Sequence, residues 1–306
     1  MLNKKATSVL EKISDAWEQW TKSIILPGMD GLTAHDLWQI YSGGIIHGTF
    51  STRASAIAFS FFMALFPFLI FILNLIPYIN FIDDFQLQFL VFMDSLLPPT
   101  TSEFFNDIFL DIASTPRGGL LSFAFILSIF LMTNGVNAIF TGFEFSYHTN
   151  ANRSIIRQYV IAVGVSIIMA LLLLITVILA VYLTYAVDDL SELGVFGEQG
   201  ISPQLVKYIV FVLLIYVAVA TLYYFGTREG RQSRFFSVGA LFTTLLILLT
   251  TYLFGLYIEN FSQYNELYGS IGALLVLMIY IWLNSNILLL GYELNASLIK
   301  LKRNFK

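Results

Sequence analysis

The chain has 306 residues, of which 57% are hydrophobic and only 12% charged, and its mean hydropathy is +0.77. A soluble domain carries roughly 25% charged residues. The composition therefore excludes an ordinary water-soluble protein and predicts lipid as the solvent. A net charge of −4 argues against a nucleic-acid partner, which needs a basic surface. The absence of cysteine excludes disulfides and thiolate chemistry.

Residues 1–31 are expected to form a cytoplasmic amphipathic helix and a linker. Trp17, Trp20 and Ile24 belong to an apolar series at helical spacing, and the charged residues between them exclude a cleavable signal. Two interpretations stay open: a helix lying on the membrane or on a partner, or a solvated helical tail. The next segment, 32–50, is too polar to cross a bilayer and fits an interfacial or re-entrant elbow.

Six segments are long and apolar enough to span about 30 Å of hydrocarbon, which takes about 20 residues. Pro67 is expected to kink the first span. The third span is longer than a bilayer requires, which predicts a tilt or a projection into the cytoplasm. The fold class is therefore an all-α polytopic bundle, with one membrane domain over 32–300 and a basic tail at 301–306. The expected spans cover residues 52–76, 118–145, 155–186, 203–226, 235–258 and 269–299.

The basic residues predict the orientation. With the N-terminus in the cytoplasm, all of the 16 lysines and arginines except Arg117 and Lys207 lie on the cytoplasmic side. Six spans also return the C-terminus to that side. We therefore expect both termini in the cytoplasm of a bacterial inner membrane.

The longest external connection, 77–117, contains two amphipathic stripes separated by Pro98 and Pro99. Thr100 and Glu103 form a capping-box pattern at the start of the second stripe. We expect two helices there, lying on the outer leaflet or covering the mouth of the bundle.

The second span carries Asn134, Asn137, Thr141 and Glu144 on one helical face. Such a face cannot point at lipid without leaving amides unsatisfied. Two interpretations remain open. The stripe makes hydrogen bonds between helices, or it forms the wall of a hydrated substrate pathway open to the cytoplasm.

The sixth span carries a second set of candidates for a substrate pathway: Asn284, Asn286, Glu293 and Asn295. Glu293 is expected near the inner boundary, at the depth of Arg53, where the two would form an ion pair. That pair is either a structural clamp or part of proton or ion coupling. The absence of a charged residue near the centre of any span weakens the coupling interpretation.

Tyr268, Gly269 and Gly272 open the sixth span, and two glycines three residues apart favour close helix packing. No catalytic residues, cofactor or metal ligands are expected. The three histidines lack metal-ligand spacing, and no phosphate loop or nucleophile elbow is present.

Four sequence motifs are similar to those of the YihY/BrkB membrane-protein family. They are residues 268–272 (YGSIG), 281–283 (IWL), 290–296 (LGYELNA) and the opening motif at 53–67. The chain departs from the family pattern at Tyr292, where a small residue is expected.

The resemblance implies a six-span bacterial inner-membrane protein, and members have been called ribonuclease BN or virulence factors. The residues give the ribonuclease label no support, because such an enzyme needs metal ligands or a histidine acid–base pair and a basic RNA track. The signature residues that match are Pro67, Tyr268, Gly269, Gly272, Glu293 and Asn295.

Three hypotheses follow. The leading one is a transport or lipid-handling protein whose partners are membrane lipids. The second is a non-transporting scaffold that binds other envelope proteins through its N-terminal helix or external segment. The third is a proton-coupled cation antiporter using Glu293. The sequence leaves the oligomeric state open, and an enzyme ranks last.

Overall fold

The computed structural model describes residues 18–25, 33–47, 50–75, 118–146, 153–192, 203–228, 230–232, 234–260 and 270–304. The described residues contain no strand, only an isolated bridge between Ile25 and Thr33. Residues 18–23 are helical, at the end of the expected N-terminal helix. The helices that follow are α2 (Ala34–His47), α3 (Phe50–Leu75), α6 (Gly118–Glu144), α7 (Ile155–Glu192), α8 (Pro203–Gly226), the 3₁₀ turn η2 (Gly230–Gln232), α9 (Val238–Asn260) and α11 (Ser270–Asn304).

Six of these helices, α3, α6, α7, α8, α9 and α11, are long and apolar enough to cross a membrane. Their large apolar side chains are often exposed, as at Phe59, Ile126 and Leu249. In water this exposure would be costly, whereas in lipid it is not. The expected all-α polytopic bundle is confirmed, and the protein is a multi-pass membrane protein.

The helices begin and end near the expected span limits, with two clear extensions. α7 continues to Glu192 and α11 to Asn304, beyond the expected ends at 186 and 299. The hydropathy marks where an apolar stretch stops, whereas backbone hydrogen bonding continues into the polar residues that follow. Pro67 lies inside α3, which runs through it.

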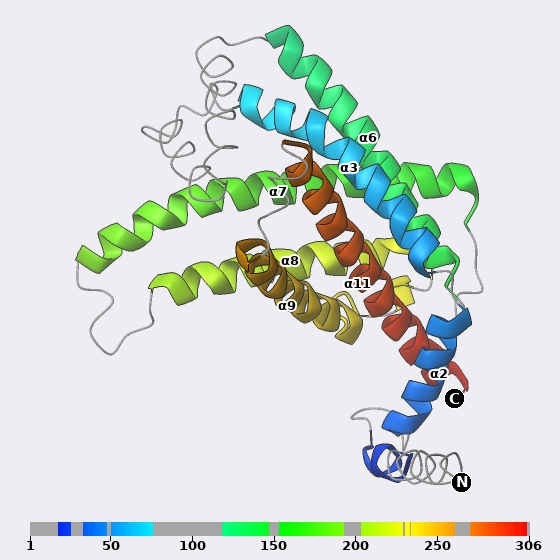
Figure 1. The fold of residues 1–306 in the computed structure, drawn as a ribbon. Helices are drawn as coiled ribbons and strands as arrows, with labels where there is room; N and C mark the ends of the chain where they lie inside the picture. The colour runs from blue at the N-terminus through cyan, green and yellow to red at the C-terminus, as the bar shows by residue number, and fades with distance from the viewer. Residues whose placement is uncertain are drawn as a thin grey trace.

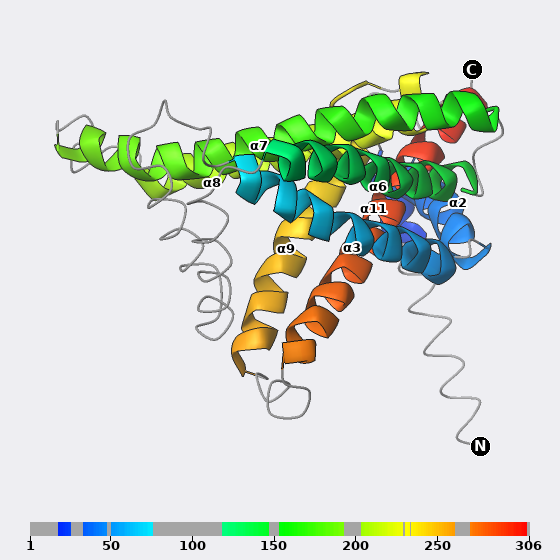
Figure 2. The same cartoon turned by 90° about the horizontal axis from the view of Figure 1, so that it is seen from above.

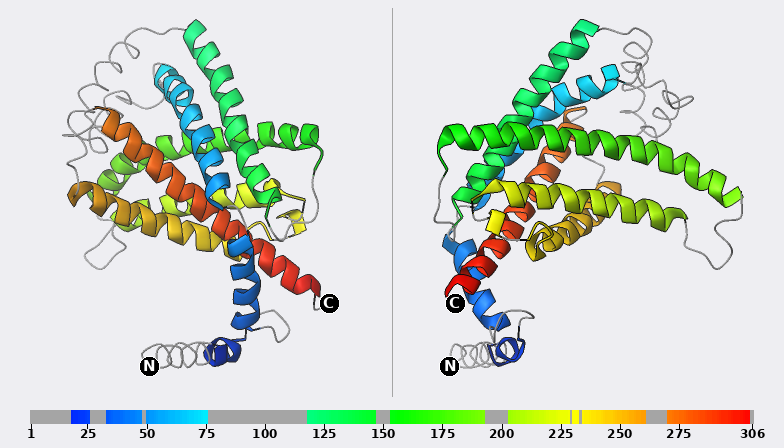
Figure 3. Two further views of the ribbon diagram at one scale, coloured as in Figure 1. Left: turned by 45° about the vertical axis from the view of Figure 1, so that its right-hand side comes forward. Right: turned by 180° about the vertical axis from the view of Figure 1, so that it is seen from behind.

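The helices meet at one end of the bundle and diverge from it (Figure 1). Seen from above, α7 and α8 extend in one direction and α9 and α11 in another (Figure 2). α7 and α8 pack side by side, as the view from behind shows (Figure 3). We call the shared end, where α3, α7 and α9 begin and α6, α8 and α11 end, the polar end.

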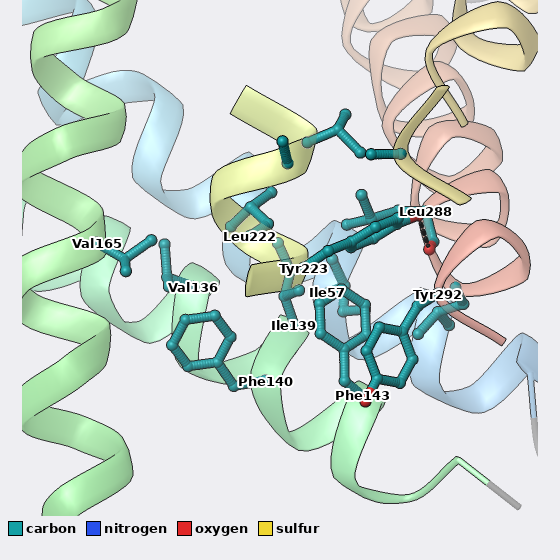
Figure 4. Close-up of a cluster of buried hydrophobic side chains, with 14 of the residues drawn as sticks. Ile57, Val136, Ile139, Phe140, Phe143, Val165, Leu222, Tyr223, Leu288 and Tyr292 are labelled. Carbon is teal, nitrogen blue, oxygen red and sulfur yellow. Dashed lines mark hydrogen bonds between the residues drawn. The ribbon is translucent and has the colours of Figure 1, made fainter. Parts of the chain in front are cut away.

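A buried core holds the helices together near this end (Figure 4). Phe140 and Phe143 of α6 are fully buried, and Ile57 of α3 and Leu289 of α11 are almost so. In water, burying each of these side chains stabilises the folded state by on the order of 1.5–3 kcal/mol. Where lipid surrounds the helices, dispersion and close packing replace much of this hydrophobic stabilisation.

The segment expected to form an elbow is a regular helix, α2, which packs against α11. A reciprocal capping box starts it: the Thr33 backbone N–H donates to Asp36 Oδ2 at 2.9 Å, and the Asp36 N–H donates to Thr33 Oγ1 at 3.3 Å. Most of the expected N-terminal amphipathic helix (1–17), the external segment 77–117, and Tyr268 with Gly269 lie outside the described residues. Gly272 is in the first turn of α11.

Candidate functional site at the polar end

Two charged side chains are buried against the last turn of α6. Arg53 is 8% exposed and Glu293 only 1% exposed. Arg53 Nη1 donates to the Gly142 carbonyl at 2.7 Å, and Ser146 Oγ donates to Glu293 Oε2 at 2.7 Å. The Gly142 carbonyl is one of the last four of α6, which have no partner within the helix. Arg53 therefore caps α6 at its negative end.

Arg53 bonds to the last turn of α6 and Glu293 to Ser146, two residues past its end, and the two charged groups attract each other electrostatically. The guanidinium of Arg53 also lies over the Phe50 ring, 4.7 Å from its centroid. The expected ion pair between Arg53 and Glu293 stays a prediction, which a double-mutant cycle can test.

α2 adds a tyrosine to this group. Burial, with a smaller contribution from the Glu293 carboxylate, raises the pKa of Tyr41 to about 12. Tyr41 lies outside the six spans. Its phenol therefore keeps its proton at neutral pH, within reach of the electrostatic influence of Glu293.

An aromatic layer closes the core beside these charges. Phe143 and Tyr292 stack with ring centroids 4.1 Å apart, and Tyr223 meets both rings edge-on. The Tyr223 hydroxyl donates to the Leu288 carbonyl at 2.7 Å (Figure 4), and that of Tyr292 bonds to Thr227 Oγ1 at 2.8 Å. Tyr292, which departs from the expected family pattern, is thus part of the packing between three helices.

Asn295, an expected pathway residue, caps a helix. Its Oδ1 accepts from the Gly239 backbone N–H at 2.8 Å, and its Nδ2 donates to Ser237 Oγ at 2.7 Å. Ser237 Oγ also accepts from the Ala240 N–H at 3.2 Å. Two first-turn amides of α9 are therefore satisfied by Ser237 and Asn295.

The polar stripe of α6 faces α7. The Gln158 amide nitrogen lies 3.0 Å from both Asn137 Oδ1 and Thr141 Oγ1. With that amide turned over, its nitrogen instead donates to Glu144 Oε2 at 2.9 Å. Tyr159 donates more weakly to Asn134 Oδ1, at 3.4 Å. The α6 stripe therefore makes hydrogen bonds between helices, and a substrate pathway along it stays a prediction.

The remaining amides of α11 bond to their own helix. Asn284 Nδ2 donates to the Tyr280 carbonyl at 2.9 Å and Asn286 Nδ2 to the Trp282 carbonyl at 2.8 Å. Of the four candidates on α11, Glu293 and Asn295 therefore bond to other segments of the chain. The side-chain amides of Asn284 and Asn286 donate within α11.

Arg153 joins three helices at this end and was missed as a site residue. Its backbone N–H donates to Glu144 Oε1 at 3.2 Å, its Nη1 donates to the Phe225 carbonyl at 2.6 Å, and it is 7% exposed. In the sequence, Arg153 is only one of many basic residues that favour one membrane side. Its burial follows from the approach of α8, which no local pattern reveals.

No group of three or more histidine, aspartate and glutamate residues within the described ranges is placed to hold a metal ion. The charged groups at the polar end come from different helices, which suits helix anchoring and recognition of a charged or polar group.

Comparison with known proteins places the chain in a family. The family model described as "Virulence factor BrkB" matches residues 45–304. The ribonuclease-like protein YfkH of Bacillus subtilis is 29% identical over 262 residues, covering 82% of this chain and 91% of the relative.

Two further relatives carry the name UPF0761 membrane protein. That of Glaesserella parasuis is 25% identical and covers 63% of this chain, and that of a Psychrobacter species is 20% identical and covers 84%. The matched parts span 65% and 47% of those two proteins, less than two thirds of their length. No solved structure matches the chain. On the family model, which covers most of the chain, the protein belongs to the BrkB virulence-factor family of membrane proteins.

Proposed function

We propose that the protein transports or otherwise handles a lipid or another amphipathic molecule in the bacterial cytoplasmic membrane. The observation that carries this proposal is the distribution of charge in the six spans. Arg53, Glu144, Arg157, Glu293 and Lys300 are the charged residues of the span windows, and all five belong to the helix ends that meet at the polar end.

An amphipathic molecule matches that distribution. Its apolar body needs no polar wall through the centre of the membrane, whereas its polar group needs partners at one membrane surface. A carrier of a bare ion instead requires charged or coordinating groups near the midplane. The positive-inside rule assigns the polar end and both termini to the cytoplasm.

The direct test is lipid movement in reconstituted vesicles. Purified protein is placed in liposomes that contain a fluorescent phospholipid, and a membrane-impermeant quencher reports how fast inner-leaflet lipid becomes accessible. We expect faster movement than in protein-free liposomes. Per folded molecule, movement should be slower with Glu293→Gln, which removes the buried charge at nearly constant volume.

Thr176→Val is the control, because it removes a polar group of a spanning helix that is not a pathway candidate and whose hydroxyl bonds within α7. It should leave the rate unchanged. Movement no faster than in empty liposomes, for phospholipid and for amphipathic solutes alike, would contradict the proposal.

A second candidate, a proton-coupled cation antiporter, is favoured by one observation: the nearly complete burial of Glu293 beside Arg53 and Tyr41. It predicts a pH-dependent cation flux in the same liposomes that Glu293→Gln abolishes. Lipid movement without any cation flux would favour the first candidate.

A further inference from the structure

A pocket of about 210 Å³ lies at the polar end and is lined by four arginines. Its lining residues are Arg153, just before α7, Arg157 and Ile161 in the first turns of α7, and Arg228 and Arg231 from the connection between α8 and α9. The volume is several times the roughly 30 Å³ that one water occupies in the liquid. The pocket therefore has room for a ligand group larger than a single water.

The connection that carries Arg228 and Arg231 is held tightly. The fully buried Thr227 accepts from the Gly230 N–H through its Oγ1 at 3.0 Å and bonds to the Tyr292 hydroxyl. A Cβ at Gly230 would come within 2.2 Å of the Tyr223 carbonyl oxygen, so only glycine fits there. The two arginines thus extend from a fixed turn.

Arg153 is also fixed, by its bond to the Phe225 carbonyl, and the guanidinium of Arg231 lies 5.6 Å from the centroid of the same phenylalanine's ring. Arg153 precedes the third span, and burial, followed by repulsion from Arg231, lowers its pKa. Arg157 repels Arg153 as well. The pocket therefore gathers like charges at close range.

Among the residues that the structure describes, little balances these charges. Glu144 attracts Arg153 and accepts from its backbone N–H. No ion pair joins the four arginines to a carboxylate of the described residues. Glu229 belongs to the same connection and lies outside those residues. Arg153 is buried, whereas Arg157, Arg228 and Arg231 are exposed to solvent at the pocket. Four arginines that line one space favour an anion there.

Phosphate is the anion whose geometry matches best, because guanidinium groups bind its oxygens through paired, charge-assisted hydrogen bonds. The position of the pocket favours a phosphate carried by a lipid. Ile155 and Ile156, at the start of α7 beside the arginines, are 86% and 80% exposed. A ligand with its phosphate in the pocket would find an apolar surface next to it, at the depth where headgroups meet acyl chains.

We propose that the pocket lined by Arg153, Arg157, Arg228 and Arg231 binds the phosphate group of an anionic ligand, with a phospholipid headgroup as the expected source. The identity of the ligand rests on the proposed function, whereas the binding of phosphate does not. The site would let the protein recognise anionic lipid in the leaflet at the polar end.

The test measures binding by the purified full chain in neutral detergent, by titration calorimetry. Three probes separate the chemistry: dihexanoyl phosphatidic acid, glycerol 3-phosphate, and dihexanoylglycerol, which lacks phosphate. We expect phosphatidic acid to bind and dihexanoylglycerol not to. If glycerol 3-phosphate binds as tightly as phosphatidic acid, the pocket is a phosphate site, but its ligand is a soluble phosphate compound and not a lipid.

Two variants with the same charge change separate the pocket from general surface charge. Arg157→Gln should weaken phosphatidic acid binding by about tenfold or more, the loss expected for a hydrogen bond to a charged group. Arg234→Gln, in the same connection but outside the pocket lining, should change it little. No binding of either phosphate probe, or equal weakening by both variants, would overturn the proposal.

This experiment fails separately from the transport assay. If the protein binds phosphate but does not move lipid, the proposed function is ruled out and the phosphate site stands. If Arg157→Gln changes neither lipid movement nor the affinity for phosphatidic acid, the phosphate site is ruled out and the proposed function stands.

Discussion

Gly291 lies where α9 and α11 cross, and the crossing leaves no room for a side chain. A Cβ there would come 1.7 Å from Thr243 Oγ1 and 2.6 Å from the Tyr223 hydroxyl. These two groups bond to each other at 2.5 Å. We therefore predict that Gly291→Ala forces the helices apart, breaks this bond and destabilises the protein by about 1–3 kcal/mol. Thermal unfolding in detergent, followed by size-exclusion chromatography, measures the loss.

Gly164→Ala is the matched control for that prediction. A Cβ at Gly164, in α7, meets nothing within 4 Å. Alanine is also a better helix former than glycine, by roughly 0.5–1 kcal/mol. We expect Gly164→Ala to unfold at the same temperature as the parent or higher. Equal melting temperatures for the two variants would show that the crossing tolerates a methyl group.

The Arg53–Glu293 pair makes a second prediction at the scale of single residues. Removing one charge of a buried pair costs about 3–5 kcal/mol, because the other charge is left uncompensated. We expect Arg53→Met and Glu293→Gln each to be strongly destabilising, and the double variant to cost less than their sum. Additive losses of stability would show that the two groups do not form a pair.

The first turn of α2 gives a prediction at the scale of an element. Hydrogen bonds from the Thr33 side chain and backbone N–H lower the pKa of Asp36. A carboxyl whose pKa is lower in the folded state stabilises that state above its ordinary pKa of about 3.9. The stabilisation is then lost as the pH falls through the lowered value.

Hydrogen exchange of the α2 amides, corrected for the intrinsic pH dependence, should therefore show protection falling below about pH 4. In Asp36→Asn the α2 amides should be less protected at neutral pH than in the parent protein, and their protection should not fall further below about pH 4. A parent protein whose α2 protection stays constant down to pH 3 would rule out this role for the capping box.

Among the elements, the six spanning helices could be predicted because hydropathy and length are local properties of the chain. The capping of α9 by Asn295 could not, since Asn295 and Gly239 are 56 positions apart. The α2 helix illustrates a further limit. Its polar residues exclude a span, yet they do not distinguish an irregular elbow from a helix that packs against α11.

The orientation of the whole molecule can be tested with single cysteines, because the chain contains none. Ser154 is exposed at the polar end, and Asp189 belongs to the last turns of α7 at the opposite end. We predict that Asp189→Cys reacts with a membrane-impermeant maleimide in intact cells. Ser154→Cys should react only after the membrane is permeabilised. The reverse pattern would place the polar end outside.

The sequence by itself determined the solvent of this protein, the number of its spanning helices, and the face of α6 on which its polar residues lie. These follow from composition and from the periodicity of neighbouring residues. Only the tertiary structure decided the partners of these groups. Gln158 bonds to the α6 stripe, the end of α6 to Arg53, and Ser146 to Glu293, and one pocket is lined by four arginines from two distant segments. The physical reason is that helices in lipid are each stable alone, while their contacts depend on close packing and hydrogen bonds between residues far apart in the chain.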